Sequence, residues 1–427
     1  MRAAVVVLAL LAPASALAHG RPPALQSLDA HPDAPETLVA QATWGLAVRG
    51  GGDWRWLCAA AFGVDARSED PAVIAGPDGA LLVGTFDGLW RSPDGGCSWE
   101  RPEARLADAF VVDVQRGPGD LYYAVASDVA REDRLWRSRD GGRQWEVLSG
   151  FGEVLVDRVR VAPSRPDRLY ASGAIPARDR RERETFLLRS DDGGRSFERF
   201  PVPFEPEERL LLLEAVDPVD PDALWAVMLH FAGELAPERL LRSEDGGETW
   251  TSPLALPQIG GVVATEGAVL AGSRLGGLYR SEDGGTFEAL DPALPVTCLA
   301  ALGGELWACT DRAVAGFGLA RVVDGVVEPA LALSEIVDPV ACPRCSTAGV
   351  VCPAWAPDVA YDLGQDASVP PGFGDGGTGA PRDAEIPAEC RPPGPPGCAC
   401  GVGAGETPSW PLGLIFVAWI LRRVTQK

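Results

Sequence analysis

Short apolar runs recur along most of the chain, and each is bounded by turn-forming residues. Leu38-Val39-Ala40, Leu169-Tyr170-Ala171 and Leu224-Trp225-Ala226 each follow a turn of the pattern Pro-x-x-Pro. Runs of this length, rich in β-branched and aromatic residues and bounded by proline, glycine and aspartate, predict short β-strands. A spacing of about 40–50 residues is typical of a repeat architecture. Seven such runs begin at Leu38, Leu81, Leu121, Leu169, Leu224, Val269 and Leu306.

A second repeated pattern, Ser-x-Asp-x-Gly followed by an aromatic residue, occurs five times. Each copy follows an apolar pair and an arginine, as in Leu240-Leu241-Arg242. Its aspartate can accept hydrogen bonds from backbone N–H groups two residues on, and its glycines allow positive φ, so the pattern predicts a hairpin turn. The fifth copy has one residue fewer before its aromatic residue, Phe287. The five aspartates are Asp94, Asp140, Asp192, Asp245 and Asp283.

These five copies resemble the Asp-box, or BNR, repeat of sialidases, sortilin-type receptors and many bacterial propellers. The resemblance implies a β-propeller in which the box turn lies at the periphery of each blade, away from ligands. We therefore expect the five aspartates to serve the structure and not the chemistry of the protein.

The fold is predicted to be all-β, a seven-bladed β-propeller over about residues 22–330 with four antiparallel strands in each blade. The first and last blades lack a clear box, although Arg49–Trp54 looks like a decayed copy in the first. Terminal repeats are often atypical, so this does not change the count. A six-bladed propeller, as in sialidases, is the alternative.

The beginning of the chain has the pattern of a secretory signal. Arg2 precedes the apolar run Ala3–Leu11, and Ala16-Leu17-Ala18 has the small-x-small form of a cleavage site. We therefore expect residues 1–18 to be a signal peptide and the mature chain to be exported. In an oxidising compartment cysteines tend to pair.

The end of the chain divides into three parts. Residues 331–364 form a small cysteine-containing segment after the propeller, and residues 365–400 are dominated by proline, glycine, aspartate and alanine. Such a composition cannot bury a core, so a disordered linker is expected. Residues 408–423 are predicted to be a short apolar helix ending in Arg422-Arg423. Its apolar run, Pro411–Leu421, is shorter than the ~20 residues that span a bilayer.

Cys398-Ala399-Cys400, the apolar run and the terminal arginines resemble the C-terminal sorting tail of myxobacterial surface proteins, the MYXO-CTERM tail. The resemblance implies that sorting machinery cuts the tail near the cysteines and retains the protein at the cell surface. Cys398 or Cys400 would then be the processed, lipid-modified residue. The alternative is a plain membrane anchor, and both interpretations place the propeller outside the cytoplasm.

The remaining eight of the ten cysteines are predicted to form disulfides and not a metal site. Cys298 and Cys309 flank Leu306 on neighbouring predicted strands and are expected to pair with each other. The spacing of Cys342 and Cys345 would suit half of a zinc site, but no second half follows. Cys342, Cys345, Cys352 and Cys390 are instead expected to staple a post-propeller module, which leaves Cys58 and Cys97 for each other. No metal or cofactor is expected.

The chain carries 38 lysines and arginines against 60 aspartates and glutamates, a net charge of −22. No basic stripe could neutralise a run of phosphates, so nucleic acid is not an expected partner. We expect a monomer whose partner is an extracellular glycan or protein.

Three predicted loops between second and third strands are long, at residues 127–134, 172–184 and 230–238. They belong to neighbouring blades and would lie on one face, which makes them a candidate ligand patch. The alternative is a solvated loop whose charges pair internally. The candidate ligand-binding residues are Arg178, Arg180, Arg181, Arg183, His230 and Phe231.

No catalytic residue is assigned. The arginine motif that precedes the first Asp-box of sialidases is absent, and four of the five tyrosines fall in predicted strands. Neither Gly-x-Ser-x-Gly nor His-Glu-x-x-His occurs. The sequence therefore predicts a surface-tethered binding or scaffolding module, with a glycan hydrolase of sialidase-like lineage as the alternative. Arginines converging with a buried carboxylate pair in the central channel would favour the hydrolase.

Overall fold

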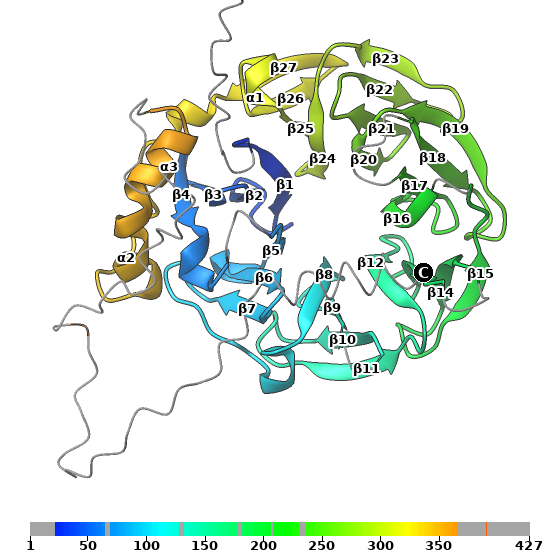
Figure 1. Cartoon of the computed structure of the whole chain (residues 1–427), viewed down its shortest axis with the longest axis horizontal. Coiled ribbons are helices and arrows are strands. Elements are labelled where there is room, and N and C mark those ends of the chain that lie inside the picture. Colours follow the sequence, from blue (N-terminus) through cyan, green and yellow to red (C-terminus); the bar gives the residue numbers. More distant parts are fainter. Residues whose placement is uncertain are drawn as a thin grey trace, which may run out of the picture.

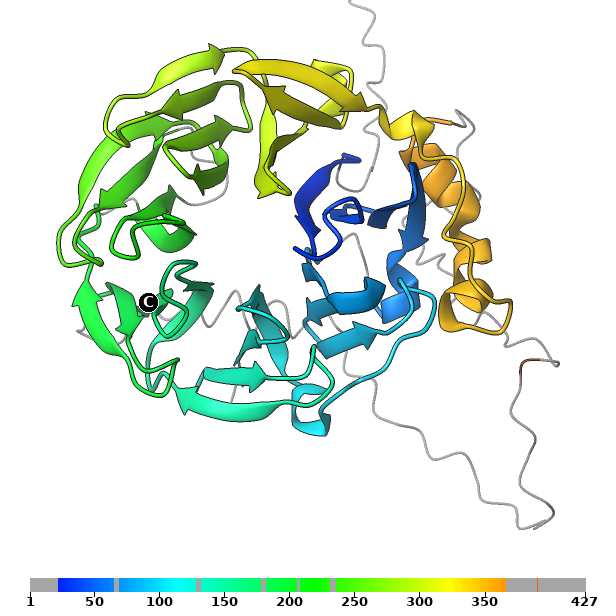
Figure 2. The ribbon, with the colours of Figure 1, turned by 180° about the vertical axis from the view of Figure 1, so that it is seen from behind.

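Twenty-seven short strands form seven antiparallel sheets arranged as blades around a central axis (Figures 1 and 2). The computed structural model describes residues 22–365 and Cys390, except for 65–68, 128–131, 178–181, 206–207 and 231–235. Within each blade the strands follow in chain order from the axis outward, so the predicted seven-bladed propeller is confirmed. The predicted signal, the linker and the C-terminal apolar segment lie outside the described residues.

The first three blades contain eleven strands. Blade 1 consists of β1 (Leu25–Ala30), β2 (Leu38–Ala42), β3 (Gly45–Gly50) and β4 (Asp53–Cys58). Blade 2 consists of β5 (Ala72–Ala75), β6 (Leu81–Thr85) and β7 (Gly88–Ser92). Blade 3 consists of β8 (Phe110–Arg116), β9 (Tyr122–Ser127), β10 (Arg134–Ser138) and β11 (Glu146–Gly150).

The other four blades are complete four-stranded sheets. Blade 4 consists of β12 (Leu155–Val161), β13 (Leu169–Ile175), β14 (Glu184–Ser190) and β15 (Glu198–Pro201). Blade 5 consists of β16 (Glu208–Val216), β17 (Leu224–His230), β18 (Glu238–Ser243) and β19 (Thr251–Leu256). Blade 6 consists of β20 (Ile259–Thr265), β21 (Ala268–Ser273), β22 (Leu278–Ser281) and β23 (Glu288–Asp291). Blade 7 consists of β24 (Val296–Leu302), β25 (Glu305–Thr310), β26 (Leu319–Val323) and β27 (Val326–Leu331).

Short helices occupy a few connections and the segment after blade 7. Three 3₁₀ turns precede or join strands of blades 1 to 3: η1 (Ala59–Phe62), η2 (Pro77–Gly79) and η3 (Ala104–Leu106). One helical turn, α1 (Arg312–Ala315), lies between β25 and β26. After β27 follow η4 (Leu333–Glu335), α2 (Thr347–Val351), η5 (Cys352–Trp355) and α3 (Ala356–Asp362).

In blade 2 the fourth strand is reduced to one bridge. Arg91 and Glu100 exchange both backbone hydrogen bonds, each at 2.9 Å, but no strand continues from them. Pro102 follows two residues later and has no N–H to donate to a ladder. The composition of this segment therefore explains why the blade stops at three full strands.

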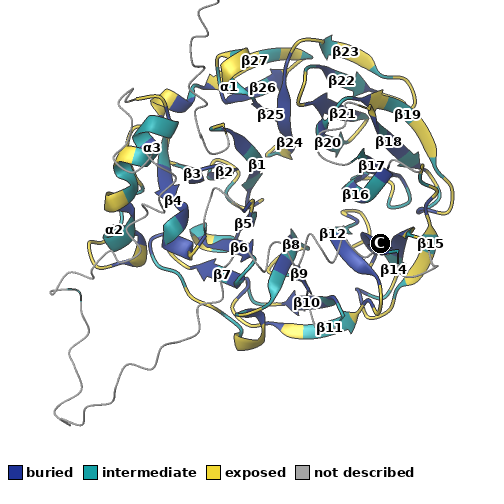
Figure 3. Cartoon of the chain, viewed as in Figure 1, coloured by how far each residue is buried: buried dark blue, intermediate teal, exposed yellow. Residues whose placement is uncertain are grey.

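The core lies between the blades and not within one central layer. Second strands such as β6 and β9 are buried along their whole length, because a neighbouring blade covers each face (Figure 3). One apolar cluster joins Tyr123 and Leu135 of blade 3 to Val156 and Leu188 of blade 4. Similar clusters join the other neighbouring blades, so each blade packs like one layer of a stack.

The repeated Ser-x-Asp-x-Gly turn joins the third and fourth strand positions of blades 2 to 6. In blade 4 the Ser190 hydroxyl donates to Asp192 Oδ1 (2.8 Å) and accepts from the Gly194 N–H (2.9 Å). Asp192 Oδ1 also accepts from the N–H groups of Arg195 (2.8 Å) and Ser196 (3.0 Å). Gly194 has a φ of 87°, a conformation that favours glycine.

The donors to the box aspartate lie three and four residues on, where the sequence predicted two. The difference arises because two consecutive glycines at positive φ widen the turn, as at Gly193 and Gly194. In the shortened fifth copy alone among the described boxes, Asp283 accepts from the second residue on, Gly285 (2.8 Å). Deleting one residue thus converts the wide turn into the tighter turn that was predicted.

A segment after blade 7, residues 333–365, crosses the outside of blade 1 and reaches blade 2; we call it the C-terminal clasp (Figure 1). The Trp56 N–H donates to the Asp338 carbonyl (3.1 Å), and the Val340 N–H donates to the Trp56 carbonyl (2.9 Å). The clasp therefore runs parallel to β4 there. Beyond this contact, the Ala348 N–H donates to the Cys97 carbonyl in blade 2 (3.0 Å).

The described residues contain four disulfides, and two of them fix the clasp. Cys58 bonds Cys352 and Cys97 bonds Cys342, with Cα–Cα distances of 5.4 and 5.2 Å. The predicted pairing of Cys58 with Cys97 is therefore wrong. The expectation that Cys342 and Cys352 staple a separate post-propeller module is also wrong, because both bond cysteines of the propeller. Cys58 and Cys97 are on blades that the clasp crosses, a relationship that sequence spacing does not reveal.

The other two disulfides are local. Cys298 and Cys309 face each other in the register of β24 and β25 and are bonded, as predicted. Cys345 is bonded to Cys390. Because Cys342 and Cys345 belong to two different disulfides, they cannot form half of a zinc site. Among the described residues, no group of histidine, cysteine, aspartate and glutamate could hold a metal ion.

The ring closes without a shared strand. Blade 1 is built only from the first four strands and blade 7 only from the last four. Their innermost strands pack together, and the Thr297 hydroxyl of β24 donates to the Leu25 carbonyl of β1 (2.7 Å). Closure therefore depends on side-by-side packing of β1 and β24 and on the clasp outside them.

Candidate functional site

The innermost strands enclose a central cavity of ≈ 650 Å³. Polar residues on its wall come from most blades, because inner strands such as β8 and β12 alternate apolar residues with charged ones. A volume of this size is within the range of small-molecule sites. The polar residues on the wall include Gln26, Asp29, Gln41, Asp70, Asp113, Gln115, Arg158, Arg160, Glu214 and Arg274.

Two arginines near the axis tie neighbouring blades together. Arg116 of blade 3 donates to the Asp29 carboxylate of blade 1 (2.6 Å) and to the Ala75 carbonyl of blade 2 (2.7 Å). Arg160 of blade 4 donates to Asp113 of blade 3 and to the Glu214 carbonyl of blade 5, both at 3.1 Å. Each guanidinium thus spans three consecutive blades, and its charge is matched by a carboxylate.

The carboxylates that receive these arginines also bind backbone. Asp29 Oδ2 accepts from the Ala75 N–H of β5 (2.7 Å), and Asp113 Oδ2 accepts from the Val159 N–H of β12 (2.8 Å). Each carboxylate therefore links its own strand to the next inner strand. We interpret Asp29 and Asp113 as structural, because their hydrogen bonds go to the protein itself.

Arg158 differs from these two arginines. Its shortest ion pair, with Glu214, is long at 3.9 Å, and its side chain is 37% exposed. The Glu214 carboxylate raises the pKa of Arg158 above its ordinary value, against the effect of burial. A guanidinium has five N–H donors, so Arg158 retains donors that can bind a ligand in the cavity.

Amide side chains supply the neutral polar groups of the wall. Gln41 donates to Asp70 Oδ1 and to the Ala42 carbonyl, both at 3.1 Å. Gln26 Oε1 accepts from Arg274 at 3.1 Å. The wall therefore presents charged and neutral hydrogen-bond donors and acceptors around one cavity, with nearly equal numbers of acidic and basic residues.

The two described residues of the predicted loop patch, Arg183 and His230, lie apart from this cavity. Arg178, Arg180, Arg181 and Phe231 are outside the described residues. Arg183 donates to the Arg209 carbonyl, and His230 Nε2 lies 3.1 Å from the Pro237 carbonyl. His230 also faces Glu208 across the β16–β17 ladder. The structure thus brings Arg183 and His230 to the same end of β16, and neither of them lines the central cavity.

Burial and the neighbouring Arg209 lower the pKa of Arg183, which is half-buried. Beside it, Glu208 is completely buried and holds Arg239 through two hydrogen bonds of 2.6 and 2.7 Å. A paired and hydrogen-bonded carboxylate of this kind is typical of a structural ion pair. The described part of the patch therefore consists of loop ends anchored to blades 4 and 5.

The sequence did not identify Arg158 or Glu214. Both lie in strands whose apolar residues indicate core, and a single charged residue in such a strand gives no sign of where it points. The only available signal was the alternation in β12, where charged residues interrupt the apolar run at Asp157, Arg158 and Arg160. That alternation marks a strand with one face toward a polar space.

The buried tyrosines do not provide a sialidase-like nucleophile. Tyr122, Tyr123 and Tyr170 are all within the packed clusters between blades. Burial raises the pKa of each phenol, that of Tyr170 to about 12. The Tyr170 hydroxyl donates to the Pro221 carbonyl in the next blade (2.8 Å), which is a structural role.

No family model matches the chain, and a search of curated proteins finds no match. Among solved structures, an ancestral GH74 enzyme shares the propeller fold with a TM-score of 0.53, 15% sequence identity and coverage of 72% of this chain and 46% of that enzyme. This chain therefore spans less than half of the enzyme's length. At such low identity the likeness shows the fold alone.

Two further structures match more loosely. The extracellular domain of a one-component system from B. thetaiotaomicron has a TM-score of 0.48 and 14% identity, over 70% of this chain and 38% of that one. The sialidase of Trypanosoma rangeli has a TM-score of 0.35 and 13% identity, over 61% of this chain and 52% of that one. Neither superposition is close enough to support an argument about function.

In the part of the chain that the structure describes, no helix is long and apolar enough to cross a membrane. The predicted C-terminal apolar helix, 408–423, and the tail cysteines Cys398 and Cys400 fall outside that part.

Proposed function

We propose that the protein is an exported binding module that holds a hydroxyl-rich ligand, the end of a glycan, in its central cavity. The observation that carries this proposal is the difference between the arginines near the axis. Arg116 and Arg160 each donate hydrogen bonds to two other blades, whereas Arg158 keeps free donor capacity beside Glu214. Sugar hydroxyls both donate and accept, so they suit a wall that mixes guanidinium, carboxylate and amide groups.

Export is supported by the cysteines. All eight cysteines of the described residues are in disulfides, a usage typical of proteins that fold in oxidising compartments. The secretory pattern of residues 1–18 agrees with this. We extend the proposal to retention at the cell surface through the C-terminal tail, with Cys398 or Cys400 as the processed residue.

A glycan hydrolase is the second candidate. It is favoured by the four carboxylates on the cavity wall, among them Asp113 and Glu214, because glycosidases use a pair of acids. Asp113, however, already accepts hydrogen bonds from Val159 and Arg160. Glu214 is therefore the carboxylate on which a hydrolase would depend.

Binding of the purified protein to a glycan array tests the main proposal. The Arg158→Gln variant should lose binding of any glycan that the native protein retains. Arg321→Gln is the matched control, because Arg321 in blade 7 is similarly exposed, at 43%, and pairs with Glu305 away from the cavity. Equal loss in both variants, or no glycan bound at all, would contradict the proposal. Release of reducing ends by the native protein and not by Glu214→Gln would instead identify a hydrolase.

A further inference from the structure

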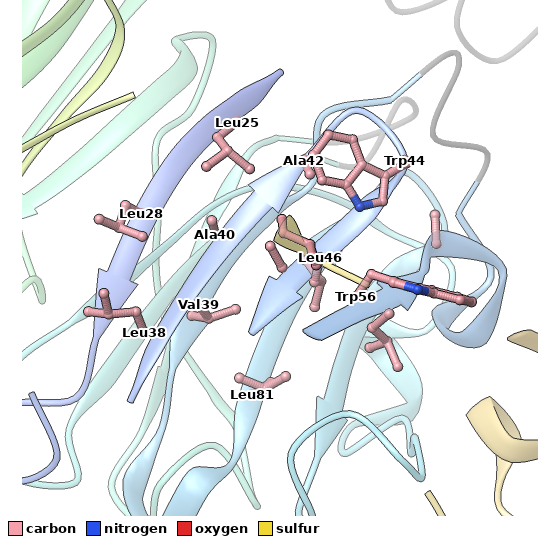
Figure 4. Close-up of a cluster of buried hydrophobic side chains, with 14 of the residues drawn as sticks. Leu25, Leu28, Leu38, Val39, Ala40, Ala42, Trp44, Leu46, Trp56 and Leu81 are labelled. Atoms are coloured by element: carbon pink, nitrogen blue, oxygen red, sulfur yellow. The ribbon is translucent and has the colours of Figure 1, made fainter. Parts of the chain in front are cut away.

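A second cavity, of ≈ 350 Å³, lies between blades 1 and 2 on the side of the Asp-box turns. Its walls come from Val39 and Val48 of blade 1 and from Ala80 and Leu81 of blade 2. Figure 4 shows Val39 and Leu81 on the two neighbouring sheets. The clasp closes its outer side with Val340 and Ala341. This cavity is separate from the central one and shares no lining residue with it.

The strand registers explain why the cavity exists. In six blades an arginine of the third strand stands opposite a large side chain of the second strand. The arginines are Arg91, Arg137, Arg189, Arg242, Arg280 and Arg321. Their partners across the ladder are Leu82, Tyr123, Tyr170, Trp225, Leu270 and Trp307. In blade 1 the same two positions are Val48 and Val39.

The large residues at these positions fill the space toward the next blade. Tyr170 reaches the Pro221 carbonyl of blade 5, and Arg91 donates from blade 2 to the Gly141 carbonyl in the box of blade 3 (3.2 Å). Valine is too short for either contact. Gly95 of the next box accordingly lines open space between blades 1 and 2. Because both residues of the pair are small in blade 1, their side chains do not fill the space toward blade 2, and a cavity remains.

The chemistry of the walls indicates what the cavity would hold. Valine, alanine and leucine supply eight of the 17 lining residues and glycine supplies four, so the walls are mainly apolar. Apolar cavities stay dry and take apolar ligands. Two charged groups lie at the rim. Arg55 is partly exposed and lies 3.7 Å from Asp338, whereas Asp94 is committed to the box turn through Ser92 and Ser98. Arg55 is thus the rim group with charge to offer an anion.

We propose that this cavity is a binding site for a small anionic amphiphile, with one or two apolar rings between Val39 and Leu81 and its acidic group on Arg55. The volume is at the lower end of the range of small-molecule sites, ~300–1,000 Å³, so ligands with more than one or two rings do not fit. The Cys97–Cys342 disulfide holds the clasp against the outer side, so the site is complete only in the oxidised protein.

Calorimetric titration of the purified full chain with anilinonaphthalene sulfonate tests the site. One molecule should bind per chain, and Val39→Trp should weaken binding about tenfold or more, because it places in blade 1 the residue that blades 5 and 7 carry at this position. Val326→Trp, on the exposed face of β27, is the matched control and should bind like the native protein. Unchanged binding in a folded Val39→Trp variant, or no saturable binding to the native chain, overturns the proposal.

Two further titrations separate the parts of the site. Arg55→Gln should weaken the sulfonate several-fold but leave the neutral N-phenylnaphthylamine unchanged, since only the acidic group faces Arg55. Equal weakening of both probes would contradict the assigned orientation. If Val39→Trp does not fold, as judged by its unfolding transition, Val39→Leu decides, because blades 2 and 6 carry leucine there. Binding of both probes undiminished in that variant would likewise overturn the proposal.

Discussion

The Gly246 N–H donates to the Asp222 carbonyl at 2.9 Å, and this bond joins the two periodic motifs of blade 5. Asp222 ends the proline-containing turn before β17, and Gly246 is the first glycine of the box after β18. Gly193 donates in the same way to Asp167 (2.9 Å), and Gly141 to Asp120 (3.1 Å). In blades 3, 4 and 5 the two motifs recur together because a backbone carbonyl of one turn accepts from a backbone N–H of the other.

We predict that the box aspartates contribute to stability without contributing to binding. Asp192→Ala removes the acceptor of Ser190, Arg195 and Ser196 and should lower the free energy of unfolding by about 1–2 kcal/mol. Urea unfolding measures this loss. Asp108→Ala, at a side chain that is 99% exposed, is the control and should have no effect. An unchanged midpoint for Asp192→Ala would contradict the structural role.

Acid should destabilise the protein by protonating the aspartates of the same turns. Burial opposes the shift at Asp192, but hydrogen bonds from Ser196, Ser190 and the Arg195 N–H outweigh it and lower its pKa to about 2. The N–H groups of Thr286 and Gly285 lower the pKa of Asp283. A carboxyl group with a depressed pKa stabilises the fold fully above its unfolded pKa, about 3.9, and loses this contribution as the pH falls through the folded value.

The unfolding midpoint should therefore be flat above about pH 5 and fall between about pH 4 and pH 2. Urea titrations at a series of pH values measure this. Asp192→Asn should show a shallower fall than the native protein, because its side chain no longer titrates. Identical slopes for the two proteins would show that the turn carboxylates do not set the acid limit.

Two disulfides of the clasp should stabilise the ring more than the third. Cys97→Ser/Cys342→Ser and Cys58→Ser/Cys352→Ser remove links of sequence separation 245 and 294, and each should cost about 2–4 kcal/mol. Cys345→Ser/Cys390→Ser removes a link of separation 45 outside the blades and should cost less. Peptide mapping of the non-reduced protein checks the pairing first. A Cys58–Cys97 peptide would refute the clasp.

The arginines near the axis should separate into two classes. Arg116→Gln leaves the partly buried Asp29 carboxylate without its guanidinium partner and should lower stability by about 2 kcal/mol. Arg158→Gln breaks only a 3.9 Å ion pair and should change stability by less than about 1 kcal/mol. Denaturant unfolding of the two variants compares them directly. A large loss for Arg158→Gln would mean that this arginine, too, is structural.

The tail is predicted to act through its cysteines. Cys398→Ser/Cys400→Ser should release the propeller from the cell surface with its unfolding transition unchanged, since both residues lie at the end of the predicted linker. Surface fractionation measures retention, and the intact mass of surface material reports processing. A mass that includes Lys427 would favour a plain membrane anchor, and full retention of the double variant would exclude the cysteines from sorting.

The architecture could be predicted from the sequence because its signals are local. Each box and each proline-containing turn lies within a dozen residues of the strands that it joins, so turn chemistry and strand periodicity were sufficient to count the blades. The predicted start of β9, Leu121, was one residue too early, because Tyr122 stands opposite the serine Ser138 of the repeated turn. An apolar run does not by itself show which of its residues begins the ladder.

The contacts that could not be predicted are those between distant parts of the chain. Cys58 and Cys352 meet because the clasp returns past blade 1, and no pattern near either cysteine encodes that path. Arg158 and Glu214 share the cavity wall only because blades 4 and 5 are neighbours in the ring. Similarly, the valine pair of blade 1 indicates a cavity only when it is compared with the other six blades, where an arginine and a large side chain occupy the same two positions.

The Cys97–Cys342 bond also turns most of the propeller into a covalent macrocycle. Every loop of blades 3 to 7 lies between these two cysteines in sequence. A protease that cuts any one of those loops leaves two pieces that remain joined through the sulfur atoms, so neither piece can diffuse away. The disulfide therefore gives the ring a tolerance to single cuts that the backbone alone does not provide.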